Sequence, residues 1–337
     1  MVNVLLIFSF IISFALTYFT IPFWIRKAKQ AGLIWEDMNK PGKPKNVAGS
    51  GGIVVVIAFI MGVLYYIAIR TFVIKDVNSI SISVFALLSA VLILSIVGII
   101  DDLLGWKNKG LSKRTRIFLA FFAAIPLVVI NAGVSTINLP LIGSINFGLL
   151  YPLLLIPLGI AGATTTYNFL AGYNGLETGQ GILILGFLSY VAYILGFAWL
   201  SVIGMVMVFA LLGFLFYNKY PAKVFPGDSL TWTIGALIAS MAILGNFEKI
   251  AIFVFIPYII ETGLKLRGKL EKHSFAKPNK DKSLEMPYKK IYGLEHLAIY
   301  FLKKIKSNKK VYEKEVVYLI HIFQIFIIIL AFFLFIY

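Results

Sequence analysis

Long apolar runs recur along the chain and are separated by short polar stretches. A tilted helix needs about 20 apolar residues to cross a hydrocarbon core about 30 Å thick. The segments near this length are residues 4–25, 53–69, 82–100, 117–134, 147–167, 181–196, 198–217, 230–244, 250–264 and 316–337. The pattern predicts an all-α, polytopic membrane protein of about ten transmembrane helices, built as a single domain over residues 1–337.

Composition and charge predict how the chain is oriented across the membrane. Hydrophobic residues make up 60% of the chain and charged residues 14%, yet the net charge is +16. Of the 31 Lys and Arg residues, 28 lie in residues 26–45, 107–116, 219–223 and 265–314. If ten helices alternate, these segments share one side, which the positive-inside rule places in the cytoplasm. Both termini are then outside, and residues 265–315 form a cytoplasmic loop between the last two helices.

The same distribution bears on the partners of the protein. Because the basic residues follow the predicted topology, the charge mainly reports membrane orientation, with attraction of anionic lipid or substrate as a second contribution. The bilayer is therefore the expected partner, and nucleic acid is not. The chain has no cysteine, which excludes disulfides, thiolate catalysis and cysteine metal sites.

Four acidic residues lie within a few residues of predicted helix ends on the cytoplasmic side: Asp101, Asp102, Glu177 and Asp228. A single acid at a helix end can simply be solvated. Four on one face favour a water-filled functional cleft, because an ionisable group near the membrane boundary is costly when dry. We therefore expect an active site at the cytoplasmic face.

The residues around these acids suggest phosphate chemistry. Asp101 and Asp102 are followed by W-K-N-K-G-L-S-K-R-T-R, a cationic loop that ends at Arg116. Carboxylates can orient a divalent cation while basic side chains offset phosphate charge, so this pairing suits a metal-bridged polyphosphate.

Two further polar stretches adjoin predicted helices. Residues 168–181 read N-F-L-A-G-Y-N-G-L-E-T-G-Q-G, where glycines allow backbone amides to approach a ligand and asparagine amides can bind a metal or a base. Residues 223–229 read K-V-F-P-G-D-S and place Phe225 for stacking on a flat ring. The simpler alternatives are a flexible turn for the first stretch and a helix cap for Asp228.

Together these stretches resemble the polyprenyl-phosphate N-acetylhexosamine-1-phosphate transferases. D-D at 101–102 with its basic loop, N-F-L-A-G-Y-N-G-L-E-T-G-Q and V-F-P-G-D-S are similar to family motifs. D-M-N-K at 37–40 and L-E-M-P-Y at 284–288 are similar to the branch that loads N-acetylglucosamine phosphate onto dolichyl phosphate. The histidine-rich motif of the peptidoglycan branch is missing. K-H-S-F-A-K-P-N at 272–279 stands where the eukaryotic dolichyl-type enzyme has R-H-R-I-P-R-L-N, so Ser274 occupies a family arginine position.

The resemblance implies transfer of N-acetylglucosamine 1-phosphate from UDP-N-acetylglucosamine to dolichyl or another polyprenyl phosphate, with UMP released. Mg²⁺, or Mn²⁺ in its place, would bind Asp228 and Asn168 and be supported by Asp102. Asp101 would orient or deprotonate the lipid phosphate, and Arg116 would face a phosphate. The remaining implied substrate-binding residues are Asn39, Gly172, Asn174, Glu177, Phe225, Lys272, His273 and Lys277.

Alternatives stay open at this point. Within the enzyme class, the donor could be another UDP-N-acetylhexosamine and the acceptor undecaprenyl phosphate, as in cell-wall polymer synthesis. A proton-coupled transporter also keeps acids in membrane helices, although usually near the bilayer midplane. A prokaryotic plasma membrane and an ER-type membrane both fit the sequence, and a homodimer is compatible with it.

Overall fold

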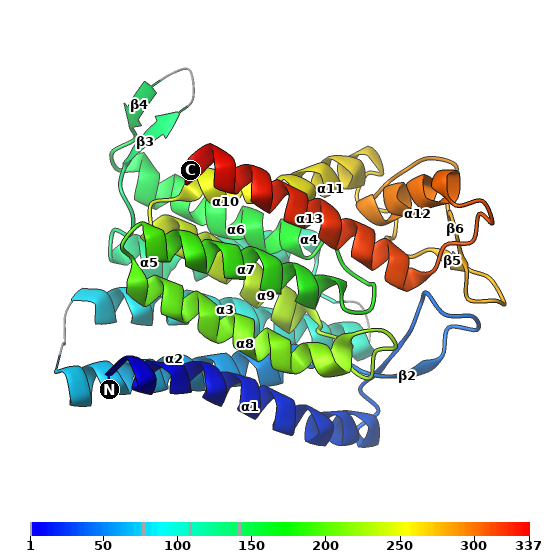
Figure 1. Ribbon diagram of the computed structural model, residues 1–337, viewed down its shortest axis with the longest axis horizontal. Coiled ribbons are helices and arrows are strands. Elements are labelled where there is room, and N and C mark those ends of the chain that lie inside the picture. The colour runs from blue at the N-terminus through cyan, green and yellow to red at the C-terminus, as the bar shows by residue number, and fades with distance from the viewer. Residues whose placement is uncertain (1, 76–78, 108–109, 140–142) are drawn as a thin grey trace.

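The computed structural model describes residues 2–75, 79–107, 110–139 and 143–337. Lys109 of the predicted basic loop lies outside the described residues. Helices supply most of the regular structure and run roughly along the long axis of the molecule (Figure 1). In chain order they are α1 (Val2–Gln30), α2 (Gly52–Ile69), α3 (Ser79–Lys107), α4 (Lys113–Ala123), α5 (Ile125–Val129), α6 (Ile156–Tyr167), α7 (Leu176–Ile194), α8 (Ala198–Asn218), α9 (Asp228–Leu244), α10 (Glu248–Val254), α11 (Ile256–Arg267), α12 (Leu294–Ile305) and α13 (Glu313–Phe335).

Two π-helical turns and three short hairpins complete the described elements. The turns are η1 (Arg70–Ile74), which extends α2, and η2 (Tyr151–Leu155), which leads into α6. Each hairpin is a two-stranded antiparallel sheet: β1 (Ile34–Glu36) with β2 (Lys45–Ala48), β3 (Thr136–Leu139) with β4 (Gly143–Asn146), and β5 (Lys277–Pro278) with β6 (Leu284–Glu285). The helical class predicted from the apolar pattern is thus confirmed, with hairpins only in the connections.

Five helical stretches of the described chain are long and apolar enough to cross a membrane: Leu5–Gln30, Gly52–Ile74, Ile80–Lys107, Ala198–Asn218 and Glu313–Phe335. Three other expected segments are divided near prolines: α4 gives way to α5 at Pro126, η2 to α6 at Pro157, and α10 to α11 at Pro257. Proline lacks an amide hydrogen and clashes with the preceding turn, so an uninterrupted α-helix is not expected there.

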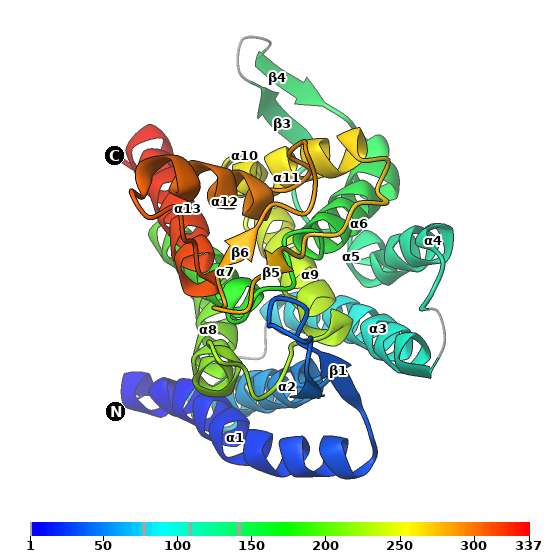
Figure 2. The ribbon, with the colours of Figure 1, turned by 90° about the vertical axis from the view of Figure 1, so that its right-hand side faces the viewer.

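Helix α9 lies at the centre of the bundle, where Figure 2 shows it surrounded by other helices. Every residue from Ser229 to Leu244 is buried. Glycines permit its close packing: a Cβ at Gly98 of α3 would lie 2.6 Å from the carbonyl oxygen of Asp228, and one at Gly235 would lie 2.6 Å from Cα of Thr164 in α6. The first close approach sets the start of α9 against α3, and the second packs the middle of α9 against α6.

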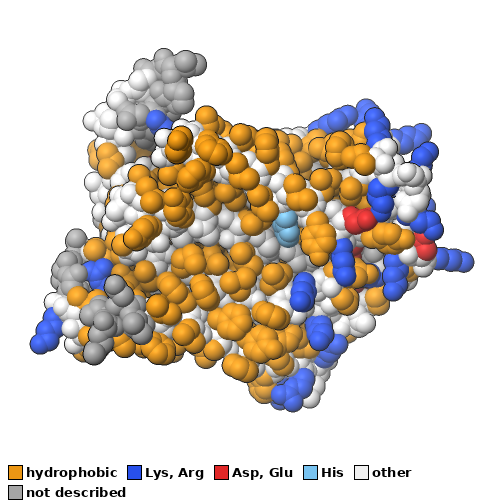
Figure 3. Space-filling model, in the orientation of Figure 1, with side chains coloured by type: hydrophobic (Ala, Val, Ile, Leu, Met, Phe, Trp, Pro, Cys, Tyr) orange, Lys and Arg blue, Asp and Glu red, His pale blue; other side chains and the backbone are white. Residues whose placement is uncertain are grey.

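The two ends of the bundle differ in character. The β1–β2 and β5–β6 hairpins and α12 lie at one end, and the N and C labels lie toward the other (Figure 1). On the face shown in Figure 3, apolar side chains cover the body of the bundle, and most Lys and Arg side chains gather at the hairpin end. The loops that carry the sequence motifs therefore meet at the basic end.

Candidate active site

Two adjoining cavities open at the basic end of the bundle. The first has a volume of about 590 Å³ and is lined by residues that include Trp35, Phe225 and Glu177. The second has a volume of about 670 Å³ and is lined by residues that include Arg116 and Lys272. They share part of their lining: Trp35, Asp102, Gly105, Asn168, Ala171, Gly172, Asp228 and Phe275. The volumes are of the size that binds small molecules.

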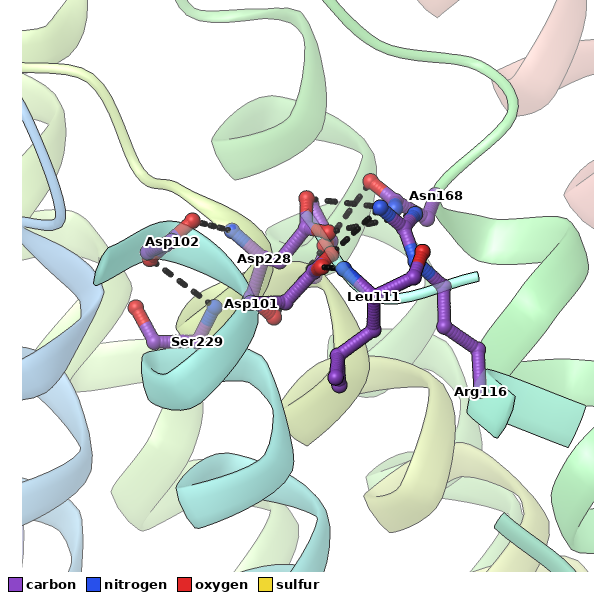
Figure 4. A network of polar contacts seen from close by, with 8 residues as sticks. Asp101, Asp102, Leu111, Arg116, Asn168, Asp228 and Ser229 are labelled. Atoms are coloured by element: carbon purple, nitrogen blue, oxygen red, sulfur yellow. Dashed lines mark hydrogen bonds and ion pairs between the residues drawn. The ribbon is translucent and has the colours of Figure 1, made fainter. Parts of the chain in front are cut away.

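Asp102 caps the start of α9. Its Oδ1 accepts a hydrogen bond from the backbone amide of Asp228 at 2.7 Å, and its Oδ2 accepts one from Ser229 at 3.4 Å (Figure 4). The first amides of a helix lack partners within the helix, and the helix dipole favours a negative charge there. Gly227, with φ of 73°, fits beneath this carboxylate, since a Cβ would lie 2.3 Å from Oδ2. Asp102 therefore fixes α3 to α9 and sets the position of Asp228.

Asp101 points away from Asp102, as expected for neighbours about 100° apart on a helix. Its carboxylate accepts a hydrogen bond from the backbone amide of Leu111 and pairs with Arg116 Nη2 at 2.6 Å. Arg116 Nη1 lies 3.5 Å from Asp228 Oδ2. One guanidinium thus joins two of the three aspartates that line the second cavity (Figure 4).

Asn168 completes the cluster from the end of α6. Its amide nitrogen donates to Asp228 Oδ1 at 3.2 Å, and its amide oxygen accepts from the Thr231 hydroxyl at 3.0 Å. Asp228 and Asn168 place a carboxylate and an amide oxygen beside a cavity, and such oxygen ligands fit a hard divalent cation such as Mg²⁺. Within the described residues, no three acidic or histidine side chains form a metal-holding group. Amide and substrate oxygens would complete such a ligand set.

Glu177 braces the glycine-rich loop from within. It lies buried in the first turn of α7, where its Oε1 accepts a hydrogen bond from the backbone amide of Gly172 at 2.7 Å. Gly172 adopts φ of 100°, and a Cβ there would lie 2.7 Å from the Phe275 ring. Glu177 thus lines the first cavity itself and also fixes Gly172, another residue of the cavity wall.

Asn39 joins three segments that are distant in sequence. Its amide nitrogen donates to the carbonyl of Gly172 at 3.0 Å, and its amide oxygen accepts from the backbone amide of Ala276 at 3.0 Å. It lines neither cavity. The structure therefore supports a positioning role for Asn39, which holds the wall shared by both cavities.

Asn174 and Lys277 do not join the other predicted residues. Asn174 lies outside the lining of both cavities. Its side-chain Oδ1 accepts a hydrogen bond from the backbone amide of Ala222 at 2.8 Å, and its own backbone amide donates to Glu313 at 2.8 Å. Lys277 lies in β5, also outside both linings. By contrast, Lys272 and His273 line the second cavity.

Lys265 is a cavity residue that motif reasoning missed. It is buried in α11, donates to the Ser274 hydroxyl at 2.5 Å and pairs with Glu261 at 3.4 Å. It lines the second cavity together with Ser274, the residue in the family arginine position. One sequence feature could have identified Lys265. It follows Glu261 by four residues in an apolar segment, and this spacing places a charged pair on one face of a helix.

Comparison with known proteins identifies the family to which the chain belongs. The model of the family described as "Glycosyl transferase family 4" matches residues 84–246, which span Asp101 to Asp228. A protein of Saccharolobus solfataricus, provisionally named UDP-N-acetylglucosamine–dolichyl-phosphate N-acetylglucosaminephosphotransferase, is 35% identical over 86% of each chain. The chain belongs to glycosyl transferase family 4 and is a transferase, which confirms the resemblance seen in its motifs.

Two further relatives represent both branches. The UDP-N-acetylglucosamine–dolichyl-phosphate N-acetylglucosaminephosphotransferase of Dictyostelium discoideum is 31% identical over 73% of this chain and 67% of its own. The phospho-N-acetylmuramoyl-pentapeptide-transferase of Halalkalibacterium halodurans is 30% identical over 78% of this chain and 83% of its own.

Proposed function

We propose that the protein transfers N-acetylglucosamine 1-phosphate from UDP-N-acetylglucosamine to dolichyl or another polyprenyl phosphate, releasing UMP. The observation that carries this proposal is the convergence of Asp101, Asp228 and Arg116 at two adjoining cavities. The names of the S. solfataricus and D. discoideum relatives support the donor and the acceptor.

Phosphoryl transfer asks a protein mainly for positioning and charge neutralisation. An oxygen of the lipid phosphate attacks the β-phosphorus of the donor, and the bond from that phosphorus to the oxygen bridging the α-phosphate breaks, so UMP leaves. Asp101 orients the lipid phosphate or accepts its remaining proton, and Arg116 offsets the phosphate charge. Asp228 and Asn168 would hold Mg²⁺, or Mn²⁺ in its place, whose charge offsets that of the transferring phosphates.

The two cavities suit the two ends of the donor. Phe225 lines the first cavity and is available for stacking on uridine beside the glycine loop at Gly172. In the second cavity, Lys272, His273 and Lys265 surround the side where sugar and phosphates would lie. Asn174 would act on uridine through the loop it holds, and Lys277 would add charge at the rim.

We also propose the topology. The five span-length helices, together with α4–α5, η2–α6, α7, α9 and α10–α11, make ten crossings of one domain. The basic end then faces the cytoplasm with the active site, both termini are outside, and residues 265–315 form the cytoplasmic loop. The membrane is a prokaryotic plasma membrane or an ER-type membrane.

The test is UMP release from UDP-N-acetylglucosamine by purified protein, with and without dolichyl phosphate and with and without Mg²⁺. Release that needs both additions is expected. Release that is independent of the lipid would contradict the transfer reaction, because a hydrolase would also produce UMP.

The name of the H. halodurans relative favours one alternative, transfer of a phospho-N-acetylmuramoyl-pentapeptide. In that alternative the acceptor would be undecaprenyl phosphate. The same catalytic cluster would serve either donor. Donor preference therefore distinguishes the two functions, and the measurement is given in the Discussion.

A further inference from the structure

A third hollow, the lateral groove, lies outside the candidate active site. It has a volume of about 530 Å³ and lies between α7, α8 and α13. Figure 1 shows these helices at the front of the bundle, and Figure 3 shows the same face, apolar along its body with Lys and Arg at its basic end. The lining of the groove belongs to neither of the two cavities described above.

The groove has an apolar body and a cationic mouth. Ile182, Leu212 and Ile325 contribute to the body. Lys219, directly after α8, and Lys314, in the first turn of α13, stand at the mouth, and both are exposed. Among the described residues that line the groove, none is acidic. One positive end and one apolar end match the two parts of an anionic phospholipid.

The position of the two lysines suits a lipid headgroup. Both belong to helix ends at the basic end of the bundle, where the proposed cytoplasmic interface lies. Each also adjoins an aromatic ring: the Lys219 ammonium lies 5.4 Å from the ring centroid of Phe216, and that of Lys314 lies 5.0 Å from that of Tyr220. Long basic side chains at such a boundary extend along apolar surface toward the headgroups.

The groove and the candidate active site are lined by neighbouring residues of the same loop: Asn174 and Gly175 line the groove, and Gly172 and Tyr173 line the first cavity. The Tyr220 ring contacts both Lys314, which lines the groove, and Lys40, whose ammonium is 4.1 Å from the same ring centroid. Lys40 follows Asn39, which holds Gly172. Asn174, in the same loop, lines the groove and bonds to Ala222. A ligand at Lys314 would therefore contact the outer side of the wall that Asn39 holds from within.

We propose that the lateral groove binds one anionic phospholipid of the surrounding bilayer, with its phosphate between Lys219 and Lys314 and an acyl chain along Ile182 and Ile325. The reacting lipid phosphate belongs elsewhere, because the loop 168–176 separates this groove from Asp101 and Asp228. The proposal concerns a bound lipid cofactor of the fold and does not depend on which donor or acceptor the enzyme uses.

The experiment measures lipid retention by native mass spectrometry after exchange into phosphatidylglycerol or phosphatidylcholine. The wild-type protein should retain phosphatidylglycerol preferentially. Lys219→Gln combined with Lys314→Gln should lower that retention by roughly tenfold or more, given the contribution of each interfacial lysine. Ile325→Trp, which fills the groove without changing charge, should lower retention of both lipids at this site.

The matched control is Lys289→Gln combined with Lys290→Gln, which removes the same charge from exposed positions that line none of these three hollows. It should keep the wild-type preference. Equal retention of the two lipids by the wild type, an unchanged preference in the Lys219 and Lys314 variant, or an equal loss in the control would each overturn the proposal. Excess dolichyl phosphate should not displace the retained phosphatidylglycerol, and displacement would assign the groove to the acceptor.

Discussion

Asp102 of α3 accepts hydrogen bonds from the backbone amides that open α9 and thereby places Asp228 beside Asn168. The paired aspartates therefore differ in kind. Both line the second cavity, but the Asp102 carboxylate bonds to the start of α9, whereas the Asp101 carboxylate pairs with Arg116. This difference is the basis of the first two predictions.

Replacing Asp228 should remove the proposed metal ligand. Asp228→Asn keeps the shape of the side chain and loses its charge, so turnover should fall by at least ~10²-fold, the scale of lost transition-state charge stabilisation. The measurement is UMP release across a Mg²⁺ titration. Asp281→Asn, at an exposed ion pair with Lys310, is the control and should be silent. Wild-type Mg²⁺-dependent turnover in the Asp228 variant would remove this residue from the site.

The two adjacent aspartates should respond differently to the same substitution. Asp101→Asn should impair turnover more than Mg²⁺ affinity, because Asp101 faces the phosphates and is not a ligand. Asp102→Asn should do the reverse and should also lower thermal stability, since a weaker cap costs a helix about 1 kcal/mol. Rates, metal titrations and melting curves of the two variants decide the matter. Identical results for both would show that the division of roles is wrong.

Donor choice should follow the segment that lines the second cavity. UDP-N-acetylglucosamine should be used at least ~10²-fold better than UDP-glucose, because a site shaped for the N-acetyl group leaves polar groups unpaired when the group is missing. UDP-N-acetylmuramoyl-pentapeptide should not react detectably. The measurement is kcat/KM for three donors with one dolichyl-phosphate acceptor. Comparable values for the muramoyl donor would place the protein with the peptidoglycan branch.

Stability should depend on pH through His296 of α12. Burial, with Lys265 nearby, lowers the pKa of His296 from 6.5 to about 4. Between these values the unfolded chain binds a proton that the folded chain does not, so the contribution of this histidine is present above pH 6.5 and is lost as the pH falls toward 4. From pH 7 to pH 5 the loss is at most about 2 kcal/mol.

The variant His296→Leu isolates this contribution. Its melting temperature should fall less than that of the wild type between pH 7 and pH 5. The test compares the variant with the wild type because the buried Glu295, present in both, has a raised pKa and changes stability with the opposite sign as the pH falls. Parallel pH profiles for the two proteins would refute the assignment.

Sequence patterns indicated which polar side chains meet at the candidate site better than they indicated how each one points. Asp101, Asp228 and Arg116 could be grouped because each lies beside an apolar segment on the same side of the predicted topology. A loop has no hydrophobic periodicity from which its conformation could be predicted. Asn174 and Gly172 are two residues apart, yet only Gly172 lines the cavities. Which side chains face a cavity depends on contacts such as the one between Gly172 and Phe275.

The same limit applies to the helices. Hydrophobicity located apolar segments that the structure forms as helices, but prolines such as Pro126 and Pro257 divide two of them into short helices. The pair formed by Glu261 and Lys265 was visible as a charged spacing in an apolar run. Its link to Ser274 was not, because that contact depends on how the segment after α11 folds back.

The two hydrogen bonds of Asn39 can form only after distant parts of the chain have been synthesised. Its partners Gly172 and Ala276 lie 133 and 237 residues further along the chain. A chain still being synthesised, with α1 to α9 complete, already carries Asp101 and Asp228 but lacks Phe275, which lines both cavities, and Ala276, which bonds to Asn39. The acids of the site are thus made early, and the cavity around them closes only when the segment after α11 has emerged.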